Sequence, residues 1–190
     1  MRQNYFFGYG SLVNRRTHVY EAAHPAKAVG WRRAWRATAD RKIAILTVIP
    51  APACTIDGLI AHVPNNDWAA LDKREAAYQR LPAASSVLHE AGQIEDIAIY
   101  AVNQDHLILP DEQRPILLSY LDVVIQGYLR EYGAKGPDKF FETTTGWEAP
   151  VLNDRAVPRY PRAQNLTTAE RAVVDSGLAH LGTPLIFNAG

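Results

Sequence analysis

Alternating apolar and polar positions predict that the first half of the chain is mostly β-structure. A short aromatic run before Gly8 reads as the first strand, a β-branched run ends at Pro50, and a later strand is interrupted at Asp57-Gly58. A turn at Gly92 is expected to join the last two strands as a hairpin. The predicted strands cover residues 5–7, 29–35, 43–49, 55–63, 87–90 and 97–102.

Helical spacing replaces this alternation in the second half. Apolar residues recur at intervals of three and four from Ile116 to Leu129, and Gly133 is placed to end that helix. Thr167, with Glu170 three residues later, is a capping-box pattern that opens a terminal helix. Between the two helices, residues 146–161 contain three prolines, so we expect an irregular segment laid over the surface or over a site.

One further helix is predicted over residues 67–81, and it carries the most informative carboxylate. Spacings of three, four and three residues place four side chains on one inward-facing stripe of this helix, namely Trp68, Leu71, Glu75 and Tyr78. The same spacing leaves Arg74 on the exposed side of the helix. A carboxylate on an apolar stripe loses hydration, which raises its pKa toward the range where it exchanges protons near neutral pH. The alternative interpretation is structural, with Glu75 paired to a core arginine such as Arg33 or Arg36.

The second candidate feature is the loop of residues 8–12 that follows the first strand. Its two glycines let the backbone turn sharply and expose successive N–H groups, which can hold an anion such as a carboxylate. It lacks the Gly-Lys-Ser/Thr ending of a phosphate loop and the third glycine of a dinucleotide-binding loop. An ordinary turn is the alternative interpretation. The loop consists of Gly8, Tyr9, Gly10, Ser11 and Leu12.

Length and strand spacing favour one α+β domain. The 190 residues, 47% of them apolar, can bury one sizeable core but are too few to indicate two full domains. Short connections between strands favour a mixed sheet or a small mixed, mostly antiparallel β-barrel, with flanking helices, over a parallel sheet. We therefore expect a single domain over residues 1–190, with a barrel core at about 4–103 and a helical C-terminal extension at about 111–190.

Charge and composition narrow the range of partners. Twenty Lys and Arg balance twenty Asp and Glu, so no net field attracts nucleic acid or an anionic membrane, and a small molecule recognised by a local cluster is favoured. No apolar run approaches the length that spans a bilayer. Cys54 is the only cysteine, which excludes an intramolecular disulfide and favours a reducing compartment. The first residues also lack the apolar centre of a signal peptide, so a cytoplasmic location is expected.

Other kinds of catalytic site find little support. The six histidines show no metal-ligand spacing and a cysteine-rich zinc site is excluded, so no metal is expected. Ser11 has no neighbouring histidine and no nucleophile-elbow pattern around it, which argues against a hydrolase triad.

The order and separation of these motifs resemble the γ-glutamylcyclotransferase superfamily, which includes the AIG2-like and ChaC-like proteins. The resemblance rests on the loop motif at the end of the first strand, a strand with Asp57-Gly58-Leu59, and the run from Leu71 to Glu75. In that family the loop typically reads Tyr-Gly-Ser or Tyr-Gly-Thr, and the glutamate follows a Leu-Asp pair. The match covers about half the chain, from Tyr5 to Val102.

The resemblance implies a small barrel with a cavity between the glycine loop and the helix that bears Glu75. It also implies that a γ-glutamyl amine or peptide cyclises to 5-oxoproline and releases its amine. Glu75 would be the general acid/base, the backbone of residues 8–12 would bind the substrate, and no cofactor would be needed. Some members carry a second tyrosine shortly after the glutamate, and its absence here leaves Tyr78 or Tyr100 to orient the substrate.

Two other functions stay open on the sequence. One is a non-catalytic small-molecule-binding or interaction protein on the same fold. The other is a γ-glutamyl hydrolase, which would release free glutamate instead of 5-oxoproline.

Overall fold

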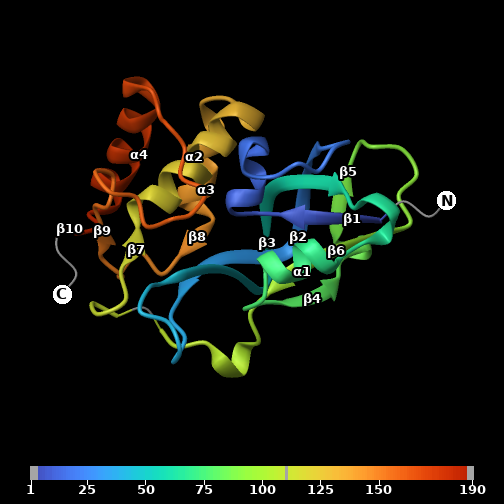
Figure 1. Ribbon diagram of the computed structural model, residues 1–190, viewed down its shortest axis with the longest axis horizontal. Coiled ribbons are helices and arrows are strands. Elements are labelled where there is room, and N and C mark those ends of the chain that lie inside the picture. Colours follow the sequence, from blue (N-terminus) through green and yellow to red (C-terminus); the bar gives the residue numbers. More distant parts are fainter. Residues whose placement is uncertain (1–3, 110, 188–190) are drawn as a thin grey trace.

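The computed structural model describes residues 4–109 and 111–187. A mixed sheet forms one side of the molecule, and three helices gather on the other (Figure 1). The sheet strands are β1 (Asn4–Gly8), β2 (His24–Arg36), β3 (Ile45–His62), β4 (Gln79–Pro82), β5 (Val87–His89), β6 (Asp96–Ala101) and β8 (Thr144–Thr145). The helices are α1 (Ala69–Arg74), α2 (Leu118–Tyr132), α3 (Lys135–Glu142) and α4 (Thr168–Leu181). Short 3-10 turns lie at Ser11–Val13, Arg15–Thr17, Pro64–Asn66, Ala84–Ser86 and Gln104–His106.

The strands run in the order β4-β6-β1-β3-β2-β5, with β8 paired to β2. Most pairs are antiparallel, whereas β1 lies parallel to β6 and β2 parallel to β8. The α+β class and the mostly antiparallel sheet are therefore confirmed. No pairing joins the two ends of this path among the described residues, so the predicted closure into a barrel is not confirmed.

The long hairpin of β2 and β3 differs from the predicted short strands. β3 is one continuous strand that neither ends at Pro50 nor breaks at Asp57-Gly58. Both prolines of β3 lie at the irregularity in this ladder. Pro50 pairs with Trp31 at the edge of the register shift, and Pro52 lies within the shift, where the regular ladder is interrupted and proline is best tolerated. Gly58 is required for packing, since a Cβ there would lie 2.5 Å from the carbonyl oxygen of Gly8.

Two further predictions around the first-half helix are wrong. α1 ends at Arg74, a turn follows, and the remainder of the predicted helix becomes β4, which pairs with β6. The predicted hairpin of residues 87–102 does not form, because β5 pairs with β2 and β6 pairs with β1 and β4. In each case hydrogen bonds to distant strands outweigh local preference.

The helical second half largely confirms the prediction. α2 ends at Gly133, and α4 has the Thr167–Glu170 capping box and a left-handed Gly182 at its end. Helix α3 was not predicted, because Gly136 and Pro137 suggest a turn. Pro137 lies in its first turn, where its missing N–H would have no partner within the helix. A small second sheet joins β7 (Ile116–Leu117), β9 (Val151–Leu152) and β10 (Leu185–Ile186).

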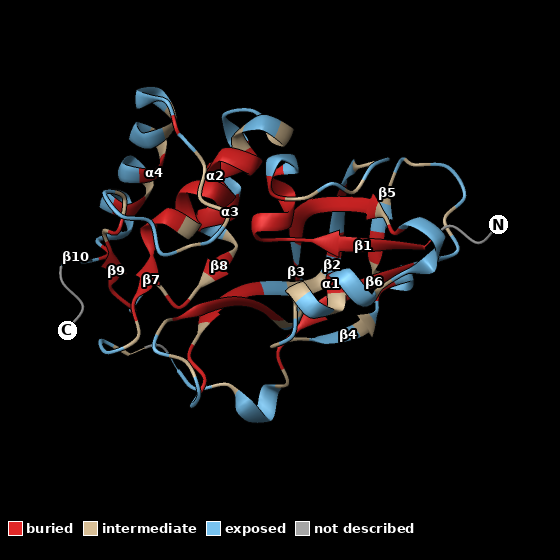
Figure 2. Ribbon diagram, viewed as in Figure 1, coloured by how far each residue is buried: buried red, intermediate tan, exposed pale blue. Residues whose placement is uncertain are grey.

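One core joins the sheet to the helices. Phe7 and Trp35 of the sheet belong to the same buried cluster as Leu121 and Tyr128 of α2. Figure 2 shows this continuity as buried ribbon running from β1 and β3 into α2, while α4 exposes its outer face. Residues on α2 can therefore position groups at the end of β1.

Candidate active site

Glu75 and the loop of residues 8–12 border adjoining cavities. The larger has a volume of about 230 Å³ and lies between β3, the end of α1, the start of α2 and residues 159–162. A smaller hollow of about 30 Å³ follows the loop and is lined by Gly8, Tyr9, Gly10, Ser11 and Leu12. Both hollows share Ser11, Leu46, Glu75, Tyr78 and Tyr120. The structure thus brings the sequence-predicted residues together.

Glu75 caps the C-terminal end of α1 instead of lying within a longer helix. Its side chain is 17% exposed, and its Oε1 lies 3.2 Å from Nε of Arg74. Burial raises the pKa of Glu75, and the charges of Arg74 and Arg162 oppose that shift without cancelling it. The site therefore holds a partly buried carboxyl group, bordering a cavity, that gains a proton more readily than an ordinary glutamate.

The helical pattern predicts that Arg74 lies on the exposed side of its helix, but the structure buries this side chain. Its side chain is only 9% exposed. The guanidinium donates to the carbonyl oxygen of Thr17 at 2.8 Å and to the hydroxyls of Ser11 and Thr17, each at 3.2 Å. Arg74 therefore connects Glu75 to the glycine loop. Arg33 and Arg36 form no ion pair with Glu75 among the described residues.

The glycine loop passes directly from β1 into the 3-10 turn Ser11–Val13. Within the described ranges, no backbone carbonyl accepts a hydrogen bond from the amides of Gly10, Ser11 or Leu12. The Tyr120 hydroxyl lies close to the loop backbone at Gly10, and its pKa is raised mainly by burial. Gly10 leaves room for that hydroxyl, because a Cβ at this position would lie 2.5 Å from it.

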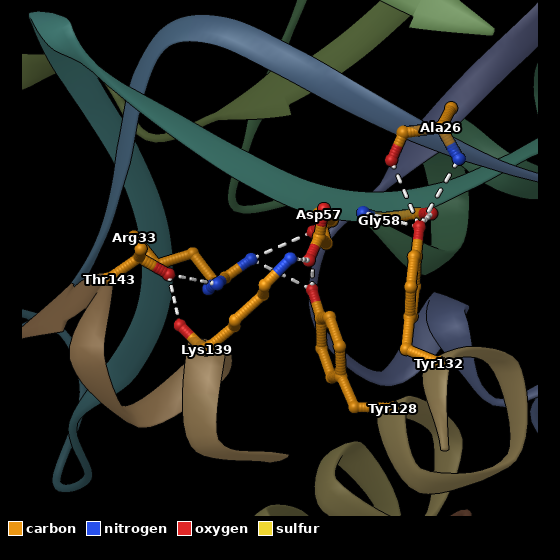
Figure 3. Close-up of polar contacts among 8 residues, drawn as sticks. All are labelled: Ala26, Arg33, Asp57, Gly58, Tyr128, Tyr132, Lys139 and Thr143. Atoms are coloured by element: carbon orange, nitrogen blue, oxygen red, sulfur yellow. Dashed lines mark hydrogen bonds and ion pairs between the residues drawn. The ribbon is translucent and has the colours of Figure 1, made fainter. Parts of the chain in front are cut away.

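A chain of buried hydrogen bonds links the glycine loop to Tyr128 of α2 and Arg33 of β2. The Tyr128 hydroxyl oxygen lies 2.8 Å from the carbonyl oxygens of both Tyr9 and Asp57. Arg33 donates from Nη1 to the Tyr128 hydroxyl at 2.9 Å and to the Asp57 carbonyl at 2.8 Å, as Figure 3 shows. The single Tyr128 proton bonds to one carbonyl at a time, and Asp57 has Arg33 as a second donor, so Tyr9 is the carbonyl that depends on Tyr128. Carbonyl and N–H point in opposite directions in a trans peptide, so this bond turns the Gly10 N–H away from Tyr128.

The two candidate tyrosines have different surroundings. Tyr78 lines the larger cavity and donates from its hydroxyl to the carbonyl oxygen of Leu46 at 2.9 Å. Tyr100 borders only the smaller hollow, and its hydroxyl donates to Oδ1 of Asp72 at 2.5 Å. Tyr78 is therefore better placed to contact a molecule in the larger cavity.

Among the cavity-wall residues that sequence reasoning did not identify, four have polar side chains that face the chemistry of the site. Tyr120 lies on the helix predicted from Ile116 to Leu129, and the remaining three are Arg41, Arg159 and Arg162. The sequence feature that could have identified Arg159 and Arg162 is the run Arg159-Tyr160-Pro161-Arg162, which places two arginines close together at the end of the proline-rich segment. Tyr160 packs edge-on against Tyr120, with ring centroids 5.0 Å apart.

Neither a membrane-spanning helix nor a cluster of metal ligands occurs among the described residues. None of the helices in residues 4–109 and 111–187 combines the length and apolar character needed to cross a membrane. Over those same residues, no group of three or more His, Cys, Asp or Glu side chains is arranged to hold a metal ion.

Comparison with known proteins identifies the family. The family model described as gamma-glutamyl cyclotransferase, AIG2-like, matches residues 6–120, and the chain belongs to that family. A search of curated proteins gave no match.

Solved structures show the same fold at low sequence identity. A structure described as gamma-glutamyl cyclotransferase has a TM-score of 0.57 and 12% identity, covering 92% of this chain and 99% of its own. An uncharacterized Homo sapiens protein, loc79017, has a TM-score of 0.58 and 13% identity over the same shares. YkqA from Bacillus subtilis has a TM-score of 0.55 and 17% identity, covering 77% of this chain and 57% of its own.

Proposed function

We propose that this protein is a γ-glutamylcyclotransferase-type enzyme acting on a γ-glutamyl amine or peptide. The substrate's α-amino nitrogen attacks its own γ-carbonyl carbon, the bond to the leaving nitrogen breaks, and 5-oxoproline and a free amine result. The reaction consumes no second substrate and needs no cofactor. Positioning supplies much of the rate, because the attacking and departing groups belong to one molecule.

Glu75 is the proposed general acid/base. The α-ammonium nitrogen loses two protons as it becomes the lactam N–H. The Glu75 carboxylate takes each proton in turn and passes it to the departing nitrogen, which leaves as an ammonium group, so the proton balance closes. Backbone amides of residues 8–12 are proposed to hold the substrate and the developing oxyanion, and Tyr78 to orient the substrate.

The observation that carries this proposal is the place of Glu75. A carboxyl group with a raised pKa borders a cavity of about 230 Å³ and is connected through Arg74 to the loop. The cavity is slightly smaller than the usual range of about 300–1,000 Å³, which suits a molecule of dipeptide size. Cys54 is a buried free thiol, which is compatible with the proposed cytoplasmic location.

The test is to incubate the protein with γ-glutamyl amino acids, γ-glutamyl amines and glutathione and to measure 5-oxoproline. Glu75→Gln keeps the side-chain size but cannot transfer a proton, so turnover should fall about a hundredfold or more, the usual scale for a general acid/base. The control is Glu142→Gln, which alters an exposed glutamate on α3.

Three outcomes would contradict the proposal. A folded and fully active Glu75→Gln variant would remove Glu75 from the mechanism. Release of free glutamate would identify a hydrolase. Binding of these compounds without any product would identify a non-catalytic binding protein.

A further inference from the structure

The larger cavity contains more positive charge than its own carboxylate balances. Its wall includes four arginines, Arg41, Arg74, Arg159 and Arg162, and one carboxylate, Glu75. Arg74 pairs with Glu75. Within the described ranges, the guanidinium groups of the other three form no hydrogen bond or ion pair with the protein. Three cationic groups with several N–H donors each therefore border one small cavity.

A substrate whose leaving amine carries no carboxylate would leave most of these arginines without an anionic partner. The γ-glutamyl group itself carries one α-carboxylate and one α-ammonium, so it provides only one anionic partner. Guanidinium groups bind carboxylates through paired, charge-assisted hydrogen bonds. At least one further carboxylate on the substrate matches the remaining arginines.

The segment that carries two of these arginines is anchored rather than loose. The buried Asp154 carboxylate accepts hydrogen bonds from the Ser119 amide at 2.8 Å and from the Arg159 amide at 2.9 Å. The Tyr160 amide donates to the Ser119 hydroxyl at 3.2 Å. These bonds fasten residues 159 and 160 to the start of α2, beside the cavity.

We propose that Arg159 and Arg162, together with Arg41, form a subsite for a carboxylate on the leaving amine. The preferred substrates are then γ-glutamyl amino acids or peptides instead of neutral γ-glutamylamines. This inference rests on the proposed function and specifies its substrate class.

The experiment compares kcat/KM for γ-glutamylalanine and for γ-glutamylethylamine, which lacks the carboxylate. The wild-type protein should prefer γ-glutamylalanine by about tenfold or more, the scale of one charge-assisted hydrogen-bonded pair. Arg159→Gln should lower that preference about fivefold or more, mainly through KM, because it removes part of the pair. We prefer Arg159→Gln to a substitution of Arg162, because the charge of Arg162 also lowers the pKa of Glu75.

The matched control is Arg32→Gln, which removes an exposed arginine from β2 outside the cavity wall. The preference should be unchanged in this variant. Equal kcat/KM for the two substrates in the wild-type protein, or equal losses for both in Arg159→Gln, would overturn the subsite.

Failure of the proposed function gives a separate result. If no substrate yields 5-oxoproline, calorimetric binding of the same two compounds still tests the subsite. Tighter binding of γ-glutamylalanine, weakened in Arg159→Gln, would support the subsite alone, and no difference would overturn it together with the function.

Discussion

Glu75 differs from an ordinary surface glutamate because the folded protein favours the protonated form of its carboxyl group. Burial outweighs the attraction of Arg74 and Arg162, so its pKa in the folded protein lies above the unfolded value of about 4.3. Between those two pKa values the folded state binds more protons than the unfolded state. This contribution to stability is therefore present at low pH and is lost as the pH rises through the folded pKa.

The first prediction concerns stability against pH. A glutamine side chain mimics the protonated carboxyl group, so Glu75→Gln should unfold at an equal or higher temperature than wild type at pH 7. The difference should disappear below about pH 4, where the wild-type carboxyl is protonated in both states. Thermal unfolding at both pH values measures it. A loss of about 3–5 kcal/mol at pH 7 would instead identify Glu75 as a structural partner of Arg74.

The second prediction concerns Tyr128, which holds the loop from α2. Tyr128→Phe removes the donor to Tyr9 and an acceptor for the buried Arg33, so it should destabilise the protein by about 1–3 kcal/mol. Since the Tyr9–Gly10 peptide loses its anchor, kcat should fall as well. Denaturant unfolding and 5-oxoproline release are the measurements.

Tyr5→Phe is the matched control for this variant. Tyr5 is a buried sheet residue whose hydroxyl has no hydrogen-bond partner in the described parts of the chain. Equal effects of the two substitutions would show that the Arg33–Tyr128–Tyr9 chain has no positioning role.

At the scale of elements, α2 depends on a cap from a distant segment. Leu117 at its N-cap position offers no side-chain acceptor, and Asp154 supplies one to the Ser119 amide and hydroxyl. A carboxylate at a helix N-terminus also interacts favourably with the helix dipole. The same carboxylate holds Arg159, so one residue stabilises the helix and fixes part of the cavity wall.

The third prediction separates these two roles. Asp154→Ala should cost about 1–2 kcal/mol, as the loss of a cap does. It should also raise KM for γ-glutamylalanine, because residues 159–162 lose their anchor. Thr167→Ala removes the side-chain cap of α4 at a comparable cost but touches no cavity residue, so its KM should stay unchanged. A KM shift in both variants would indicate a general loss of stability instead.

At the scale of the whole molecule, the shared core joins the sheet to the helical half. Phe7, Trp35, Leu121 and Tyr128 belong to one buried cluster, and β8, which follows α3, pairs with the sheet through β2. The expected helical extension is therefore packed against the strands of residues 4–103 rather than separated from them. A single domain over residues 1–190 stays a prediction that unfolding experiments can test.

The fourth prediction is one cooperative unfolding transition. Far-UV circular dichroism, which reports the helices and strands, and tryptophan fluorescence should give the same denaturant midpoint. Trp35 and Trp147 report the junction of the two halves, with ring centroids 5.7 Å apart. Two separated midpoints would show that the halves unfold as independent domains.

Local patterns in the sequence determined the elements whose signals lie within a few residues. The capping box at Thr167 and the glycines at 133 and 182 mark helix ends because backbone groups there need nearby partners. The loop of residues 8–12 and Glu75 were likewise recognised from short motifs, and their order along the chain indicated the family.

Only the tertiary structure decided which distant segments meet. Residues 79–82 became a strand because the edge of β6 offered hydrogen bonds that a longer helix could not use. Arg74 turned inward because Thr17 and Ser11, which lie 57 and 63 residues away along the chain, supply acceptors. Arg159 and Arg162 reached the cavity because Asp154 fastens their segment to α2. Such contacts depend on groups far apart in the chain, so no local period or spacing encodes them.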